Sequence, residues 1–290
     1  MNKLVKVMPF LTFGVISSTA FAHYPYVAPL SYQTFNNHTA IVSGFYDNPF
    51  ASEVAIKNFK FHYHTPTGQK IYLADDAWTK TQTLSSYSLE NKQEGTYRIR
   101  GEKQGNSLKY AQVAQKWKMV LSAVPKANQA ANQNVIYQQA LKKNMPQKTV
   151  QTIDIIETFV SRRVTSNQVI QHIHAGFDVQ FITHPNAFKK SQAIQLKVLD
   201  DKKGVANLNV EILAQTTDFS RDKKIYKALT TDAQGLLNFN MQEKGQYLMK
   251  IDYQQPFEIK KNDLKRYKYT LAFNVMDQAK TSLKSFRLVL

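Results

Sequence analysis

The histidines are the residues of this chain whose spacing could do chemistry. The 290-residue sequence holds seven of them, and four fall into two His-x-His pairs, His62 with His64 and His172 with His174. Two residues apart on a strand, both rings of a pair point to the same side, which suits two ligands of one metal ion. The competing interpretation is that each pair occupies the polar face of an exposed strand.

A fifth histidine, His23, follows a segment that is typical of an export signal. Two lysines precede the uncharged, mostly apolar run 7–21, and Ala20-Phe21-Ala22 has the small-x-small pattern after which signal peptidase cuts. We therefore predict that residues 1–22 are a signal peptide and that the mature protein begins at His23 in the periplasm.

A first-residue histidine offers a metal ion two nitrogens, one from the free α-amine and one from the imidazole. Their ordinary pKa values are about 8 and about 6.5, so both nitrogens can lose a proton to a metal near neutral pH. Pro25, at mature position three, excludes the copper or nickel site that wraps the backbone amides and needs histidine there. The pair would need further ligands, and imidazole suits Ni, Co, Cu or Zn. The alternative is a histidine that merely follows the cleavage site.

The composition excludes several classes of protein. The chain has no cysteine, which excludes disulfide scaffolds, thiolate metal sites and cysteine nucleophiles. Its net charge is +17, but the lysines are mostly scattered and no nucleic-acid-binding module is recognisable, so we expect no nucleic-acid partner. No stretch after residue 22 reaches the roughly 18 apolar residues of a membrane span, so we expect no transmembrane segment in the mature chain.

Common catalytic motifs are also missing from the sequence. Neither His-Glu-x-x-His, nor Gly-x-Ser-x-Gly, nor a phosphate-binding Gly-x-x-x-x-Gly-Lys occurs. We therefore expect a protein that is not an enzyme. One catalytic alternative stays open, because an N-terminal histidine on a β-sandwich also describes copper oxygenases that cleave polysaccharides.

Strands must position these histidines. Residues 58–65 alternate with period two, so that Phe59, Phe61 and Tyr63 fall on one face and His62 and His64 on the other. Similar alternation and β-branched or aromatic content predict further strands at 27–30, 39–46, 70–73 and 95–101, and a hairpin over 108–121 that bends near residues 114–115.

The middle of the chain is less regular. Residues 122–134 are rich in Ala, Asn and Gln and predict a loop, and the spacing of apolar residues over 136–141 predicts a short helix. Residues 169–181 predict a strand, a bend and a second strand, with the second His-x-His pair in the first strand. We assign 23–182 to a first β domain with an insertion near 122–146.

From about residue 183 the sequence pattern becomes that of a regular β module, which we extend to residue 276. Residues 277–290 form a basic tail. Thr231-Asp232-Ala233-Gln234-Gly235 and Gly245-Gln246-Tyr247 match the pattern of transthyretin-like and carboxypeptidase-regulatory-like β-sandwiches, which this module resembles. We therefore predict an all-β protein of two β-sandwich modules (Ig-like or transthyretin-like) with a short helical insertion in the first.

Residues 22–276 as a whole resemble a bacterial family of exported proteins described as periplasmic components of nickel/cobalt uptake systems. The resemblance rests on Ala22-His23-Tyr24-Pro25-Tyr26, on Gly44-Phe45-Tyr46 and on the closing segment Tyr269–Phe273. Many members carry Trp or Phe soon after the histidine, where this chain has tyrosine, and 122–134 matches no family motif. The resemblance implies a metal transporter or an outer-membrane receptor as partner.

These observations predict a periplasmic protein that binds a transition metal and serves its uptake or delivery. The predicted metal ligands are the N-terminal histidine and the two pairs: His23, His62, His64, His172 and His174. Two alternatives stay open, namely a non-metal Ig-like module that binds carbohydrate, peptide or an envelope partner, and the copper oxygenase.

Overall fold

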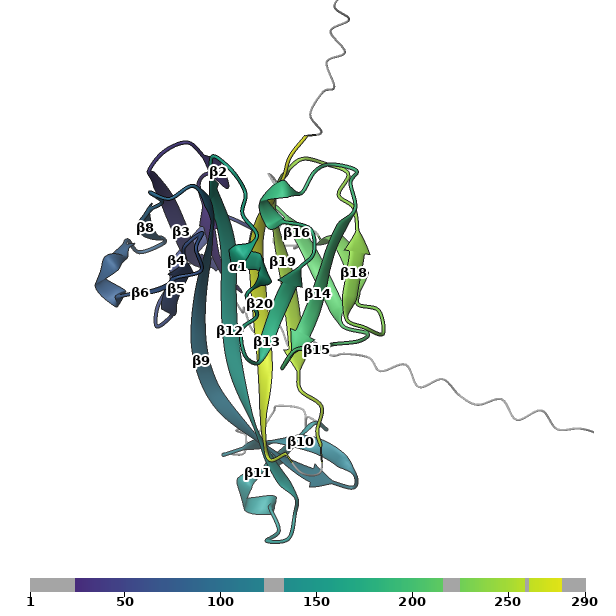
Figure 1. Ribbon diagram of the computed structural model, residues 1–290. Coiled ribbons are helices and arrows are strands. Elements are labelled where there is room, and N and C mark those ends of the chain that lie inside the picture. The colour runs from purple at the N-terminus through teal and green to yellow at the C-terminus, as the bar shows by residue number, and fades with distance from the viewer. Residues whose placement is uncertain (1–23, 123–132, 216–224, 259–260, 278–290) are drawn as a thin grey trace, which may run out of the picture.

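The computed structural model describes residues 24–122, 133–215, 225–258 and 261–277 (Figure 1). Strands make up 59% of the structure, and one α-helix occurs in the described part, α1 (Gln168–Gln171). The predicted all-β sandwich is confirmed. The predicted signal peptide, His23, most of the Gln/Asn-rich stretch and most of the basic tail lie outside the described residues. No helix in the described part is long and apolar enough to cross a bilayer.

The first sheet is built from the strands nearest the N-terminus, in the order β1, β3, β8, β7, with β4 paired to β3. Its strands are β1 (Tyr24–Pro29), β3 (His38–Tyr46), β4 (Ser52–Ala55), β7 (Thr79–Lys80) and β8 (Ser85–Glu90). The sheet buries Val27, Ile41 and Leu89 against Phe61 and Ile99 of the next sheet. Burying apolar faces of two sheets against each other is what stabilises a sandwich.

The largest sheet runs through both halves of the sequence, in the order β11, β10, β9, β12, β20, β19, β16, β17. Three further short strands belong to this sheet: β5 pairs with β9, β6 pairs with β5, and β2 pairs with β12. The bounds are β2 (Gln33–Thr34), β5 (Lys60–His64), β6 (Lys70–Leu73), β9 (Gly95–Val113), β10 (Lys116–Leu121), β11 (Val135–Tyr137), β12 (Gln147–Arg162), β16 (Asn209–Ala214), β17 (Ile225–Thr230), β19 (Gly245–Gln254) and β20 (Asp263–Val275).

A third sheet covers the C-terminal part of the large one and completes a second sandwich (Figure 1). It contains β13 (Phe177–Phe181), β14 (Ile194–Asp200), β15 (Lys203–Gly204) and β18 (Leu236–Phe239). Phe177, Leu196, Ile212, Tyr269 and Phe273 are among the buried residues of the core between the two sheets.

The segment Thr231-Asp232-Ala233-Gln234-Gly235 forms a turn before β18. Asp232 Oδ1 accepts hydrogen bonds from the backbone N–H groups of Gln234 and Leu236, at 2.9 and 2.8 Å. Gly235 has φ +79°, and a Cβ there would lie 2.7 Å from a backbone atom, so only glycine fits.

Two sequence-based predictions of local structure are wrong. The helix expected over 136–141 is the strand β11 followed by the 3-10 turn η2 (Gln138–Ala140), because residues 135–137 pair in parallel with the free edge of β10. The strand expected to carry His172 and His174 is also absent. Helix α1 stands in its place, and the two histidines follow it in irregular extended backbone.

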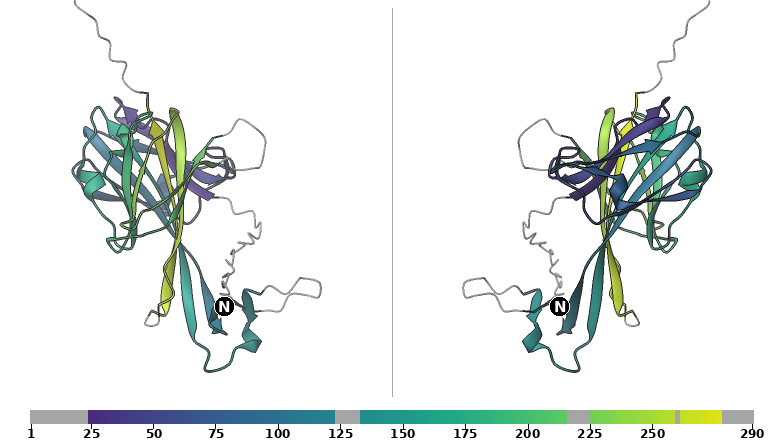
Figure 2. Two further views of the ribbon diagram at one scale, coloured as in Figure 1. Left: turned by 90° about the vertical axis from the view of Figure 1, so that its right-hand side faces the viewer. Right: turned by 90° about the vertical axis from the view of Figure 1, so that its left-hand side faces the viewer.

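The ends of β9 and β12 extend beyond the two sandwiches as a narrow ribbon that carries β10 and β11 at its far end (Figures 1 and 2). The predicted hairpin over 108–121 is confirmed: β9 and β10 are joined by Ala114 and Gln115, which both have positive φ, 47° and 63°. We call the ribbon formed by residues 105–122 and 133–151 the arm.

Candidate metal centre

The two His-x-His pairs meet at one place in the fold. The ring centroids of His62 and His64 are 5.4 Å apart, and those of His172 and His174 are 4.8 Å apart. Between the pairs, His64 lies 4.7 Å from His172 and 5.6 Å from His174, and His62 lies 5.7 Å from His174. We call these four residues the histidine cluster.

The first pair lies on a face of β5 that is covered, contrary to the interpretation of an exposed polar face. His62 and His64 are 5% and 3% exposed. The cover comes from the segment that follows α1. Helix α1 buries Val169 and Ile170 in the second core, and Arg98 Nη1 donates a hydrogen bond of 2.7 Å to the carbonyl oxygen of His172. His172 itself is exposed, so it forms the solvent side of the cluster.

Three ring nitrogens of the cluster are buried and have no hydrogen-bond partner among the described residues: His62 Nε2, His64 Nδ1 and His174 Nε2. A buried polar atom without a partner costs about 1–3 kcal/mol. His62, His64 and His174 each offer a ligand atom within 4.8 Å of the others. A tetrahedral ion with bonds of about 2.1 Å holds its ligands about 3.4 Å apart, so the rings must close by about an ångström to bind one.

The surroundings keep the imidazoles neutral, which is the form that binds a metal. Burial, followed by the charge of Lys70, lowers the pKa of His62 to about 2. Burial, followed by repulsion from His172, lowers the pKa of His64 to about 4. Burial also lowers the pKa of His174 and, although it is more exposed, that of His172.

Asp178 sets the tautomer of His174. Its Oδ2 lies 3.0 Å from His174 Nδ1 and accepts a second hydrogen bond, of 2.7 Å, from the backbone N–H of the same residue. Burial would raise the pKa of Asp178, but Arg98 and the bond to His174 hold it well below its ordinary value. An ionised carboxylate only accepts, so Nδ1 carries the proton and Nε2 presents its lone pair to the cluster. Carboxylates orient metal-binding histidines in this way.

A buried layer of paired charges lies directly beside the histidine cluster. In the register of β5 with β9, His62 is opposite Arg100 and His64 is opposite Arg98, so all four side chains share one face of the sheet. Arg98 Nε and Nη2 donate to Glu157 at 2.7 and 3.1 Å, and Nη2 also donates to Asp178 at 2.7 Å.

Arg100 and Tyr269 complete this charged layer. Arg100 Nη1 lies 3.0 Å from Asp178 Oδ1, and the Tyr269 hydroxyl donates to Glu157 Oε2 at 2.6 Å. Both carboxylates are therefore already paired with guanidinium groups. Glu157, His174 and Asp178 also offer ligand atoms within 4.8 Å of one another, but the charges of both carboxylates are compensated by the guanidinium groups.

Sequence reasoning missed the four charged residues of this layer, Arg98, Arg100, Glu157 and Asp178. A signal was present in Arg98-Ile99-Arg100, because alternation puts both guanidinium groups on one face of the strand. Charged residues at alternate positions usually indicate a face exposed to water, and only the three-dimensional pairing shows that this face is buried.

The remaining described histidines lie away from the cluster. His184 precedes the 3-10 turn η3 (Pro185–Ala187), where its Nδ1 accepts from the backbone N–H of Asn186 at 3.1 Å and its Nε2 lies 3.0 Å from Thr96 Oγ1. His38 is exposed, with Nε2 3.7 Å from a carboxylate oxygen of Glu90. Neither residue belongs to the histidine cluster. His23 lies outside the described residues, so its part in the site stays a prediction.

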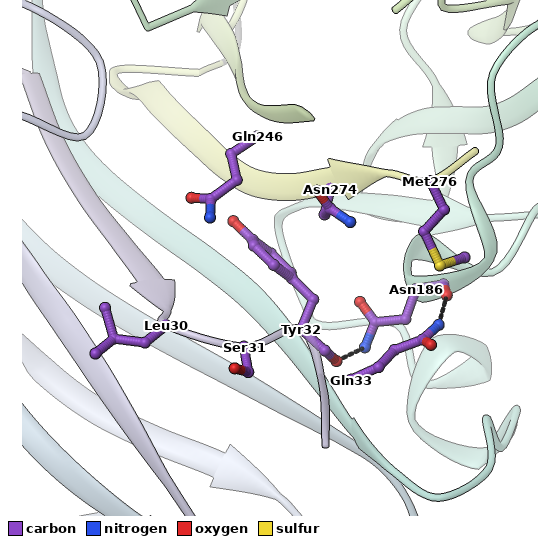
Figure 3. Close-up of a pocket in the computed structure, with 8 residues that line it drawn as sticks. All are labelled: Leu30, Ser31, Tyr32, Gln33, Asn186, Gln246, Asn274 and Met276. Carbon is purple, nitrogen blue, oxygen red and sulfur yellow. Dashed lines mark hydrogen bonds between the residues drawn. The ribbon is translucent and has the colours of Figure 1, made fainter. Parts of the chain in front are cut away.

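A second candidate site is a hollow of about 270 Å³ with a neutral, amide-rich wall (Figure 3). It lies between the segment that follows β1 and the ends of β19 and β20, and it has no charged lining residue. Asn186 Nδ2 donates to the carbonyl oxygen of Tyr32 at 3.0 Å, and the Tyr32 hydroxyl is buried without a hydrogen-bond partner among the described residues. The polar lining residues are Ser31, Tyr32, Gln33, Asn186, Gln246 and Asn274.

Comparison with solved structures finds β-rich proteins at low similarity. They include activated Escherichia coli alpha-2-macroglobulin, at 7% identity and a TM-score of 0.24 over 89% of this chain, and a marsupial T cell receptor, at 8% identity and 0.20 over 89%. The matches span 20% of the macroglobulin and 73% of the receptor chain. Similarity at this level carries no argument about function.

No curated protein matches the sequence. A protein family does match it, over residues 20–255, which is most of the chain. The description of that family assigns no activity, metal or partner, so the nickel/cobalt role implied by the resemblance stays a proposal. The chain belongs to the family described as Domain of unknown function (DUF4198).

Proposed function

We propose that this protein binds a transition-metal ion in the histidine cluster. The observation that carries the proposal is that His62, His64 and His174 each offer a ligand atom within 4.8 Å of the others and each hold a buried ring nitrogen without a partner among the described residues. His172 lies at the solvent side and would supply the fourth nitrogen. Neutral imidazoles suit Ni, Co, Cu or Zn, and Asp178 holds one of them in the binding tautomer.

We further propose that the ion is cargo, taken up and passed to a metal transporter or an outer-membrane receptor of the periplasm. The carboxylates beside the site support binding rather than catalysis. Glu157 and Asp178 are both held by Arg98 and Arg100, so neither is free to act as a general base. The exposed His172 offers a route by which an ion can enter and leave.

The test is calorimetric titration of the exported protein with Ni, Co, Cu and Zn salts, beside the variants His64→Ala, His174→Ala and His38→Ala. We expect micromolar or tighter binding of at least one metal, weakened at least a hundredfold by His64→Ala. His38→Ala removes an exposed histidine outside the cluster and should bind as the native protein does. Unchanged affinity in both His64→Ala and His174→Ala would contradict the proposal.

His23 is tested separately. N-terminal sequencing of the exported protein shows whether His23 is its first residue, and the His23→Ala variant, which keeps an α-amine, shows whether the imidazole contributes. If metal binding is lost in His23→Ala but survives in His64→Ala, the site is at the N-terminus and not in the histidine cluster.

The neutral hollow favours a second candidate function, the binding of a neutral polar ligand such as a carbohydrate. Amide side chains and an unpaired tyrosine hydroxyl are the groups that recognise sugar hydroxyls by hydrogen bonding. Titration of neutral oligosaccharides should then give binding that Asn274→Ala weakens and His64→Ala leaves unchanged. Absence of binding to neutral oligosaccharides would remove this candidate and leave the metal proposal intact.

A further inference from the structure

The arm has a charge unlike that of the rest of the molecule. Its residues, 105–122 and 133–151, include six lysines and no aspartate, glutamate or arginine. Lys109, Lys116, Lys142 and Lys143 are exposed. Among the described residues no ion pair involves a lysine of the arm, whereas Lys92, Lys244 and Lys250 of the sandwiches each pair with a carboxylate. Lys148 is buried and donates to the carbonyl oxygen of Lys261, but the charges of the four exposed lysines are available to a partner.

The strand register sorts the arm into two faces. Lys116 pairs with Val113 and Lys118 with Ala111 across the hairpin, so both lysines point to the same side as Lys109, two residues before Ala111. The opposite face carries aromatic rings. Trp117 stacks on Phe257 at a centroid distance of 4.8 Å, and Tyr110 meets the same ring edge-on at 5.6 Å.

The apolar side chains of the arm are only partly covered. None of the residues 105–122 or 133–151 belongs to the three buried clusters of the described fold. The strands β10 and β11 are half-exposed at nearly every apolar position, including Trp117, Met119, Leu121, Ile136 and Tyr137. The arm thus offers lysine charge beside partly exposed aromatic and aliphatic groups, at the end of a ribbon that projects from the sandwiches (Figure 2).

We propose that the arm docks the protein on a membrane surface by binding anionic lipid headgroups. Lysine charge combined with aromatic and aliphatic groups is the composition that binds the headgroup region of a bilayer. The arm contains lysine and no arginine. This composition favours a lipid surface over a protein partner, because protein interfaces are enriched in arginine and depleted of lysine. This proposal does not depend on the metal site.

The first test is sedimentation of the exported protein with vesicles of phosphatidylcholine alone and of phosphatidylcholine with phosphatidylglycerol. Each lysine near an anionic surface strengthens partitioning about fivefold. The triple variant Lys109→Gln, Lys116→Gln, Lys118→Gln should therefore bind the anionic vesicles about a hundredfold more weakly. The matched control, Lys80→Gln, Lys202→Gln, Lys203→Gln, removes the same charge from exposed sites outside the arm and should bind nearly as the native protein does.

The second test uses the absence of cysteine from the chain. Single cysteines introduced as Gln139→Cys, in η2 of the arm, and as Gln234→Cys, in the turn before β18, can each carry an environment-sensitive dye. With anionic vesicles we expect the emission of the dye on the arm to shift to the blue and that of the dye at residue 234 to stay unchanged.

Three results would overturn the proposal. One is equal binding to neutral and anionic vesicles, and another is an equal loss of binding in the arm variant and its charge-matched control. The third is failure of the native protein to sediment with anionic vesicles at about 0.15 M salt. Binding of the arm to an acidic polypeptide such as polyglutamate would not rescue the proposal in that case. The circular dichroism of each variant establishes that its loss of binding is not a loss of fold.

Discussion

Two polar regions lie side by side on one face of the large sheet, and they differ in how completely they are paired. In the charged layer, Arg98 and Arg100 satisfy Glu157 and Asp178, and Tyr269 donates to a remaining oxygen. In the histidine cluster, three ring nitrogens are equally removed from water but have no partner among the described residues. The charged layer is paired within the protein, whereas the histidine cluster leaves three nitrogens that a bound ion could coordinate.

On the metal proposal, the charged layer stabilises the fold, whereas the histidine cluster is held in place by the fold for binding. A buried ion pair that is fully hydrogen-bonded resists the loss of any member, because the remaining charge is left without compensation. A buried imidazole without a partner instead lowers the stability of the metal-free protein. Substitutions in the two layers should therefore act in opposite ways on stability and on metal binding.

The largest effect is expected from Arg98→Ala, which leaves two buried carboxylates with one guanidinium. The free energy of unfolding should fall by about 3–5 kcal/mol, as measured by urea denaturation. Arg266→Ala is the matched control, since Arg266 pairs with Asp252 at a partly exposed site and its loss should cost about 1 kcal/mol or less. Equal losses in the two variants would show that the charged layer is not a stabilising unit.

A metal that binds the histidine cluster should stabilise the fold by mass action. At a free concentration a hundred times its Kd, the ion raises the free energy of unfolding by about 2.7 kcal/mol, visible as a rise in Tm. The rise should vanish in His64→Ala and persist in His38→Ala. A rise that persists in His64→Ala would place the bound ion elsewhere.

The metal-free protein should lose stability on mild acidification. The folded-state pKa values of His62 and His64 are lowered to about 2 and about 4, so between pH 6.5 and 4 the unfolded chain binds protons that the folded protein does not. Stability is then full above pH 6.5 and falls as the pH drops, by about 1.4 kcal/mol per pH unit for each such histidine.

Denaturation at pH 7 and at pH 5.5 checks this difference. The expected fall for the native protein is about 2 kcal/mol, and His64→Leu should show a smaller one because it removes one of the two histidines. If the native protein is as stable at pH 5.5 as at pH 7, the histidines of the cluster take up protons in the folded state as readily as in the unfolded state.

The smallest effect on stability is expected from His62→Phe without metal. The substitution removes a buried nitrogen that has no partner and keeps a flat ring of similar size, so the free energy of unfolding should change by less than about 1 kcal/mol. Metal affinity should fall at least a hundredfold in the same variant. A large loss of stability here would contradict the distinction between the two layers.

Much of the fold could be predicted because its signals are local. Alternation over 39–46, 58–65 and 70–73 predicted β3, β5 and β6, and Ala114-Gln115 marked the hairpin bend. The helix expected over 136–141 failed because pairing with β10 overrides a short helical spacing. Which strands share an edge depends on the whole fold and not on the segment itself.

The individual histidines of the site could be predicted from the sequence, but their convergence at one place could not. The spacing of each His-x-His pair pointed to shared geometry, yet the meeting of the two pairs depends on the path of the chain between β5 and α1. The covering segment, His172 to His174, follows a one-turn helix whose buried residues belong to the second core. No local pattern encodes that contact, and the burial of Arg98 and Arg100 depends on the same long-range packing.

The position of β20 constrains the order in which the protein can assemble. It is the last described strand, yet it lies in the middle of the large sheet, parallel to β12 on one side and antiparallel to β19 on the other. During synthesis the edge of β12 therefore has no neighbour until residues 263–275 emerge. An exposed strand edge invites aggregation, and pairing of the final strand with β12 removes that edge.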